Sequence, residues 1–205
     1  MQTVTRTSVV AVSIAAVVLV AWWTIEQLRR PTPQPPARTL ATVEVPTVDD
    51  DKPRDLTGLH NVVAYHDGFY SGSVPESNAG FDTLSAMGVR TIISVDGAVP
   101  DVDAAKARGI RYIHLPIGYN GFDESRKKEL VRATRDAMYV GPVYMHCHHG
   151  KHRSAGAAGT VAASLGWAKP EEMVDRMKVS GTAPGYTGLY ACTAAAVVMT
   201  VAEID

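Results

Sequence analysis

The chain has little cysteine and no excess of charge. Two cysteines, Cys147 and Cys192, are all that its 205 residues contain, which is too few for a disulfide framework. Twenty lysines and arginines face 21 aspartates and glutamates, for a formal net charge of −1. That balance argues against a general nucleic-acid-binding surface, so no nucleic acid is expected as a partner. No internal repeat is visible either. The length leaves room for one folded domain behind the N-terminal segment.

One short stretch carries most of the recognisable chemistry. Residues 146–154 read His-Cys-His-His-Gly-Lys-His-Arg-Ser, so five residues separate Cys147 from Arg153. The apolar run at 142–145 is typical of a buried strand, and the small residues at 155–165 are typical of a helix. A strand, a tight loop and a helix N-terminus form an anion site, because free N–H groups and the helix dipole converge there. The stretch therefore predicts a phosphate-binding loop.

Individual side chains of this loop supply what an attack on phosphorus needs. Arg153 carries a planar guanidinium that can grip two phosphate oxygens. Cys147 is expected at the base of the loop, where the same positive field favours the thiolate. A cysteine that merely filled the core would leave Gly150, Arg153 and Ser154 unexplained at their positions. We therefore interpret Cys147 as a nucleophile.

The stretch resembles the Cys-x5-Arg signature of the protein tyrosine phosphatase superfamily, most of all its compact dual-specificity branch. The likeness extends from residue 58 onward through the expected strands and helices. It implies a cysteine-dependent phosphatase in which Cys147 forms a phosphocysteine intermediate and Arg153 clamps the phosphoryl oxygens. It also implies that Ser154 stabilises the cysteine as a leaving group and that His146 orients the loop. A mobile loop should bring an aspartic acid.

The remaining loop residues are expected to surround the phosphate. These phosphate-binding positions are His148, His149, Gly150, Lys151, His152 and Arg153. Four histidines and a cysteine within seven residues are also compatible with a zinc site. However, the chain has no Cys-x2-Cys or His-Glu-x-x-His motif to complete such a site. We therefore expect neither a metal nor another cofactor.

The general acid is less clear than the nucleophile. The loop after the expected strand at 111–117 contains one aspartate, Asp123, 24 residues before Cys147. Asn120 holds an earlier position in that loop, but an amide cannot protonate a leaving group. Asp123 also directly precedes a helical pattern at 124–138, so an N-cap is the alternative. Asp96, at the end of another expected strand, is a weaker candidate, because aspartates there often bind loop amides.

The N-terminus contains a long apolar run. Residues 9–25 carry no charge, and Trp22 and Trp23 lie where an interfacial belt would place them. We interpret residues 1–30 as a single-pass membrane anchor, with a cleaved signal segment as the alternative. The arginines after the run favour a cytoplasmic catalytic domain, although a long domain can be translocated regardless.

The rest of the chain divides into a linker and a domain. Proline-rich residues 31–56 are typical of an extended, mobile tether. Residues 57–205 predict an α/β domain with a central, mainly parallel sheet flanked by helices. Its strands are expected at 61–64, 68–71, 89–95, 111–117 and 142–145. Its helices are expected at 79–87, 102–108, 124–138 and 155–165, followed by one that begins at Pro170 and one over 184–201.

Two classes of function follow. The first is a membrane-tethered phosphatase that hydrolyses phosphotyrosine, phosphoserine or phosphothreonine proteins, with a phosphoinositide phosphatase as its variant. Lys151 and the loop histidines favour anionic phospholipids, whereas the breadth of the resembled family favours a phosphorylated protein. The second is a pseudophosphatase that binds phosphate without turnover, which the uncertainty about Asp123 leaves open.

Overall fold

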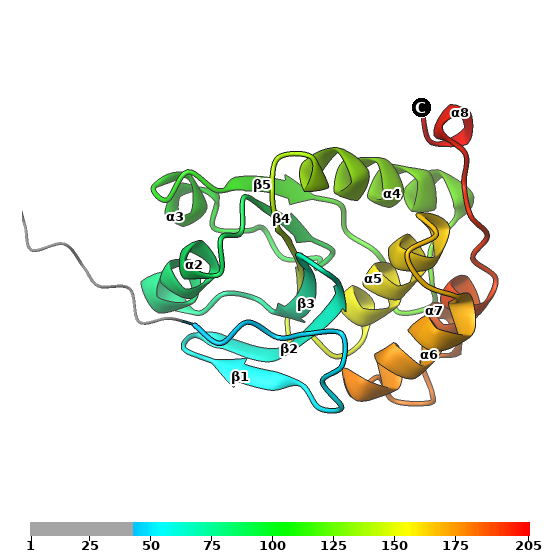
Figure 1. Cartoon of the computed structure of the whole chain (residues 1–205), viewed down its shortest axis with the longest axis horizontal. Helices are drawn as coiled ribbons and strands as arrows, with labels where there is room; N and C mark the ends of the chain where they lie inside the picture. The colour runs from blue at the N-terminus through cyan, green and yellow to red at the C-terminus, as the bar shows by residue number, and fades with distance from the viewer. Residues whose placement is uncertain (1–42) are drawn as a thin grey trace, which may run out of the picture. The chain divides into compact units, whose positions relative to one another are not determined.

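The structure, a computed structural model, describes residues 43–205, which build one sheet with helices on both faces (Figure 1). Within these residues the sheet has six strands in the order β1-β2-β3-β6-β4-β5. Their bounds are β1 (Arg54–Leu56), β2 (Leu59–His66), β3 (Phe69–Ser73), β4 (Thr91–Ser94), β5 (Arg111–His114) and β6 (Val143–Cys147). Strands β3, β6, β4 and β5 pair in parallel, whereas β1, β2 and β3 pair as antiparallel neighbours. The predicted α/β class with a mainly parallel sheet is confirmed.

Helices cover the two faces of the sheet unequally. They are α2 (Ser77–Ala86), α3 (Val102–Lys106), α4 (Glu124–Met138), α5 (Arg153–Ser164), α6 (Pro170–Val179), α7 (Thr187–Ala194) and α8 (Val201–Ile204). One apolar core lies under α2 and α3 and includes Phe81, Leu84 and Ile92. The larger core lies under α4 to α7 and includes Leu130 and Met145 (Figure 1). Because β6 is central, the loop that follows it lies between the two halves of the sheet.

Most of the expected elements are present, but the last helix is broken. The sequence predicts one helix over 184–201, whereas α7 ends at its C-cap Ala195 and α8 begins only at Val201. Between them, the Met199 N–H donates a hydrogen bond to the Ser164 carbonyl at 2.8 Å. This contact turns the segment back onto the end of α5. The prediction of a continuous helix was therefore wrong.

The folded domain also begins earlier than residue 57. The sequence assigns residues 31–56 to a tether, but Val43 and Val45 pack against the apolar core and β1 joins the sheet edge. The Arg176 guanidinium on α6 donates to the Thr47 and Asp50 carbonyls. These contacts hold residues 43–56 on the domain, which corrects the predicted boundary. Residues 31–42 lie outside the described part.

The expected membrane anchor at residues 1–30 lies outside the described residues and stays a prediction. Among residues 43–205, no helix combines the length and the apolar character needed to cross a bilayer.

Candidate active site

The loop between β6 and α5 lies at the carboxyl end of the parallel strands. Cys147 is the last residue of β6, pairs in register with Ser73 of β3 and is 3% exposed. Helix α5 begins six residues later at Arg153, so its free N–H groups face the space above the cysteine. Parallel α/β folds bind ligands at this edge. The predicted strand, loop and helix are therefore all in place.

Gly150 makes the loop tight enough to close over the sheet. Its φ of +74° lies in the left-handed region that glycine adopts without strain. A side chain there would place its Cβ 2.3 Å from the Gly72 carbonyl carbon and 2.5 Å from the Ser73 nitrogen. Any residue larger than glycine would therefore push the loop away from β3.

Ser154 lies beside the candidate nucleophile. Its hydroxyl oxygen is 3.4 Å from the Cys147 sulfur, and both side chains are buried. When the sulfur is a thiolate, this hydroxyl can donate to it. The contact agrees with the role that the sequence resemblance implies for Ser154.

Arg153 is held from two directions, by a carboxylate and by an aromatic ring. Its Nη2 contacts the Asp96 carboxylate at 2.9 Å, and its Cζ lies 4.5 Å from the centre of the Tyr119 ring. Its Nε is buried and has no hydrogen-bond partner among the described residues. A buried donor without an acceptor is costly, so this atom is well suited to bind a phosphate oxygen.

Asp96 acts in this arrangement as a charge partner. Its other oxygen accepts the Ala98 N–H at 3.0 Å. Burial by itself would raise the pKa of the carboxyl, but the hydrogen bond from Ala98 and the charge of Arg153 outweigh it and lower the pKa. Asp96 is therefore ionised at neutral pH, and its carboxylate fixes the position of Arg153.

His146 is buried behind the loop in its neutral form. Its Nε2 lies 2.5 Å from the Tyr112 hydroxyl, and its Nδ1 lies 3.4 Å from the Cys147 carbonyl oxygen. Burial lowers the pKa of His146 to about 4, while burial also raises the pKa of Tyr112. We assign Tyr112 as donor to Nε2, which leaves an Nδ1–H to donate to the carbonyl. His146 thus orients the cysteine backbone, and Tyr112 orients His146.

The loop expected to bring the acid lies against α7. Gly188 allows this packing, because a Cβ there would be 2.1 Å from the Asn120 carbonyl oxygen. The Asp123 carboxylate accepts the Arg126 N–H at 2.8 Å and so caps α4. None of its hydrogen bonds within residues 43–205 reaches the loop between β6 and α5. The N-cap alternative is confirmed, and the role of general acid stays a prediction.

Asn61 positions the loop between β6 and α5, although no sequence motif singles it out. Its amide nitrogen donates to the Gly150 carbonyl at 3.1 Å and to the Ser180 carbonyl at 2.6 Å. It holds a φ of +59°, and its backbone N–H binds the Asp55 carboxylate at 2.9 Å. The Thr182 hydroxyl adds a bond to the Lys151 carbonyl. The loop between β6 and α5 is therefore tied to both β2 and the end of α6.

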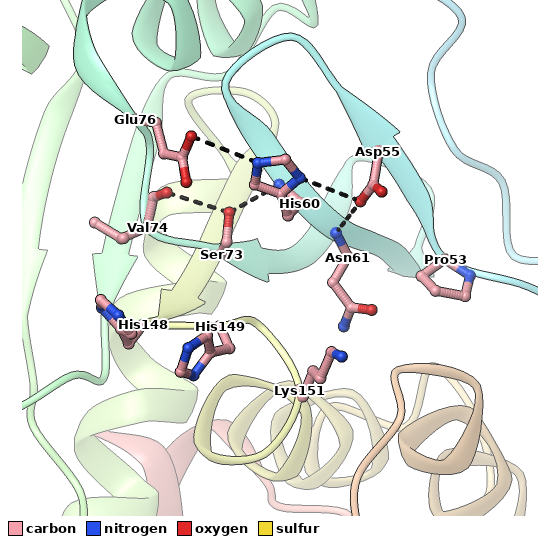
Figure 2. Close-up of a pocket in the computed structure, with 10 residues that line it drawn as sticks. All are labelled: Pro53, Asp55, His60, Asn61, Ser73, Val74, Glu76, His148, His149 and Lys151. Carbon is pink, nitrogen blue, oxygen red and sulfur yellow. Dashed lines mark hydrogen bonds and ion pairs between the residues drawn. The ribbon is translucent and has the colours of Figure 1, made fainter.

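The charged loop side chains do not all face the same way. His148, His149 and Lys151 line a cavity of about 470 Å³ beside the loop, which Figure 2 shows. The His152 ring instead packs on Tyr186, with ring centres 4.1 Å apart. The predicted phosphate-binding residues therefore do not act as one set. The side chains of His148, His149 and Lys151 line the side cavity, whereas the His152 ring packs on Tyr186. No group of metal-binding side chains occurs in the part of the chain that the structure describes.

The sequence of the chain matches no protein-family model and no curated protein. Solved structures match its fold. TpbA of P. aeruginosa is 18% identical with a TM-score of 0.51, over 72% of this chain and 99% of that chain. The catalytic core of Siw14 is 13% identical with a TM-score of 0.58, over 74% of this chain and 91% of that chain. PTPMT1 in complex with PI(5)P is 15% identical with a TM-score of 0.52, over 64% of this chain and 94% of that chain.

These matches share one architecture. The described part of the chain has the fold of cysteine-dependent phosphatases of the dual-specificity type. The predicted resemblance is confirmed at the level of the fold.

Proposed function

We propose that the chain is a cysteine-dependent phosphatase that hydrolyses phosphomonoesters through a phosphocysteine intermediate. The observation that carries this proposal is the arrangement around Cys147. The buried sulfur lies beside the Ser154 hydroxyl at the start of a helix, and the buried Nε of Arg153 has no acceptor among residues 43–205. A phosphoryl group supplies oxygens for that donor and for the loop N–H groups.

The reaction follows from these positions. The Cys147 thiolate attacks phosphorus, a P–S bond forms, and the bond to the leaving oxygen breaks. Arg153 and the loop N–H groups stabilise the charge on the phosphoryl oxygens. Water then attacks phosphorus, its proton passes to the Asp123 carboxylate or to solvent water, and the P–S bond breaks so that sulfur leaves as a thiolate that the Ser154 hydroxyl stabilises. The leaving oxygen of the first step takes a proton from Asp123 or from water.

We propose a phosphorylated protein as the substrate, carrying phosphotyrosine, phosphoserine or phosphothreonine. Proteins of this fold differ in what they bind: one TpbA structure holds phosphotyrosine, Siw14 is described as a PP-IP phosphatase, and one PTPMT1 structure holds PI(5)P. An anionic phospholipid is the alternative substrate, favoured by Lys151 at the loop. We also propose that residues 1–30 tether the enzyme to a membrane, with the catalytic domain on the cytoplasmic side.

A pseudophosphatase is the second candidate function. The observation that favours it is the Asp123 carboxylate, which caps α4 and makes no hydrogen bond to the phosphate loop. Such a protein would bind phosphate without turnover.

The test is an assay of the full chain in detergent micelles against phosphotyrosine peptides, phosphoserine peptides and phosphoinositide vesicles. Turnover of any of them that is lost in Cys147→Ser supports the phosphatase. Binding of the same ligands without turnover supports the pseudophosphatase. Turnover that survives in Cys147→Ser contradicts the proposed chemistry.

A further inference from the structure

The cavity beside the phosphate loop has two walls of opposite charge. Figure 2 shows the loop side chains on one side and the side chains of β1, β2 and the start of α2 on the other. Its volume of about 470 Å³ is within the range of ligand sites. The walls come from segments far apart in the sequence, so neither can be recognised from a motif.

The loop wall is positive. The Lys151 ammonium has no ion-pair partner among residues 43–205, and His148 and His149 lie beside it. The net charge of this wall is at least one positive unit whether the histidines are neutral or protonated. The wall also begins one residue after Cys147, so it adjoins the phosphoryl site.

The opposite wall stays negative. Asp55 and Glu76 flank His60, whose ring nitrogens lie 3.5 Å from one carboxylate each. No other ion-pair partner of these two carboxylates occurs in the described residues, and their side chains are 75% and 61% exposed. Two carboxylates face at most one imidazolium, so this wall keeps at least one negative charge in either state of His60.

Two apolar residues also line the cavity. Pro53 and Val74 stand among the charged groups of the cavity. Lysine and arginine bury an apolar stem and keep the charged end near polar groups, which fits such a lining. A second phosphate would instead meet Asp55 and Glu76, and like charges disfavour it there.

We propose that this cavity binds a lysine or arginine side chain next to the phosphorylated residue of a peptide substrate. The proposal rests on the proposed phosphatase function and narrows its substrate class. The phosphoryl group lies over Cys147 with Lys151 beside it, and the basic side chain lies against the opposite wall, where it contacts the exposed carboxylates that flank His60. The site thus selects phosphopeptides with a positive charge beside the phosphate.

The test uses three phosphotyrosine peptides that differ only in having lysine, glutamine or glutamate beside the phosphotyrosine. For the full chain in detergent micelles, kcat/KM should be about fivefold higher for the lysine peptide than for the glutamine peptide, because exposed ion pairs contribute modestly. The glutamate peptide should be the poorest substrate. High salt should reduce the spread by screening.

Variants of Glu76 connect that preference to the cavity. The Glu76 side chain makes no capping hydrogen bond, so substitution leaves α2 intact. Glu76→Gln should reduce the ratio of kcat/KM between the lysine and glutamine peptides. Glu76→Lys should make kcat/KM higher for the glutamate peptide than for the lysine peptide. Glu129→Gln, which removes an exposed carboxylate on α4 paired with Arg126, is the matched control and should keep the wild-type ratio. Thermal unfolding shows that each variant is folded.

The outcomes separate this proposal from the phosphatase itself. Equal kcat/KM for the three wild-type peptides, or a ratio unchanged in Glu76→Lys, overturns the basic-residue site while leaving the phosphatase standing. Wild-type turnover of phosphoinositide vesicles that exceeds its turnover of all three peptides also overturns it, because the wild-type cavity would then hold an anionic head group. If no phosphomonoester is turned over, the proposed phosphatase function is contradicted. Binding of the three peptides to Cys147→Ser, measured by fluorescence anisotropy, then still decides whether the cavity prefers the lysine peptide.

Discussion

Replacing Asn61 should loosen the phosphate loop without touching any group that contacts phosphate. Asn61→Ala removes the amide that donates to the carbonyls of Gly150 and Ser180. Both carbonyls belong to buried residues, and Asn61 itself is 8% exposed. The substitution therefore leaves two acceptors without their donor.

The magnitude follows from these contacts and from the backbone. Losing two buried hydrogen bonds costs about 2–4 kcal/mol of folding free energy. Alanine also tolerates the φ of +59° less well than asparagine, which adds about 1 kcal/mol. Asn61→Gly loses the same hydrogen bonds but not the backbone term. The expected order of stability is therefore wild type, then Asn61→Gly, then Asn61→Ala.

Urea unfolding of the three proteins measures that order. The inhibition constant for inorganic phosphate should rise about tenfold in both variants, a loss of about 1.4 kcal/mol at the loop. An Asn61→Ala protein as stable as the wild type, with unchanged phosphate inhibition, would refute the view that Asn61 holds the loop.

Three further predictions concern groups around the cysteine. If Asp123 is the general acid, Asp123→Asn should slow the turnover of alkyl phosphates by about 10²-fold and that of activated aryl phosphates much less. Equal losses with both substrates would show that Asp123 only caps α4. Because burial lowers the pKa of His146 to about 4, the unfolded chain binds more protons than the folded chain between pH 6.5 and 4. Stability should therefore fall by up to about 3 kcal/mol on acidification through that window, and urea unfolding of His146→Asn should show a flatter profile. Asp96→Asn should destabilise the fold by about 3 kcal/mol and raise KM for p-nitrophenyl phosphate, because it leaves the buried Arg153 charge without its partner; an unchanged KM would contradict the positioning role.

The local pattern of the sequence predicts much of the fold. The apolar spacing after Asp123 predicts a helix over 124–138, and α4 has these bounds with Asp123 as its N-cap. The Cys-x5-Arg spacing predicts the turn from β6 into α5, because a phosphate loop needs a strand before it and a helix after it. Structural features that depend on residues close together in the sequence could therefore be predicted from the sequence.

Structural features that depend on contacts between distant segments could not be predicted from the sequence. Asn61 lies in a strand, and only the folded chain brings it to Gly150, 89 residues later in the sequence. No motif around Asn61 therefore indicates its role. Tyr112 reaches His146 across the intervening strand β4 in the same way. The break after α7 depends on the contact between Met199 and α5, which helix propensity alone does not reveal.

Detection of a phosphoryl group on Cys147 would test the phosphocysteine mechanism itself. The full chain would be mixed with p-nitrophenyl phosphate, quenched in denaturant and digested, and the peptide that contains Cys147 examined by mass spectrometry. We predict a phosphorylated Cys147 in the wild type, unchanged by a metal chelator, and no adduct or turnover in Cys147→Ser, which still binds phosphate. Turnover without an adduct on Cys147, together with activity that persists in Cys147→Ser, would show that Cys147 is not the nucleophile.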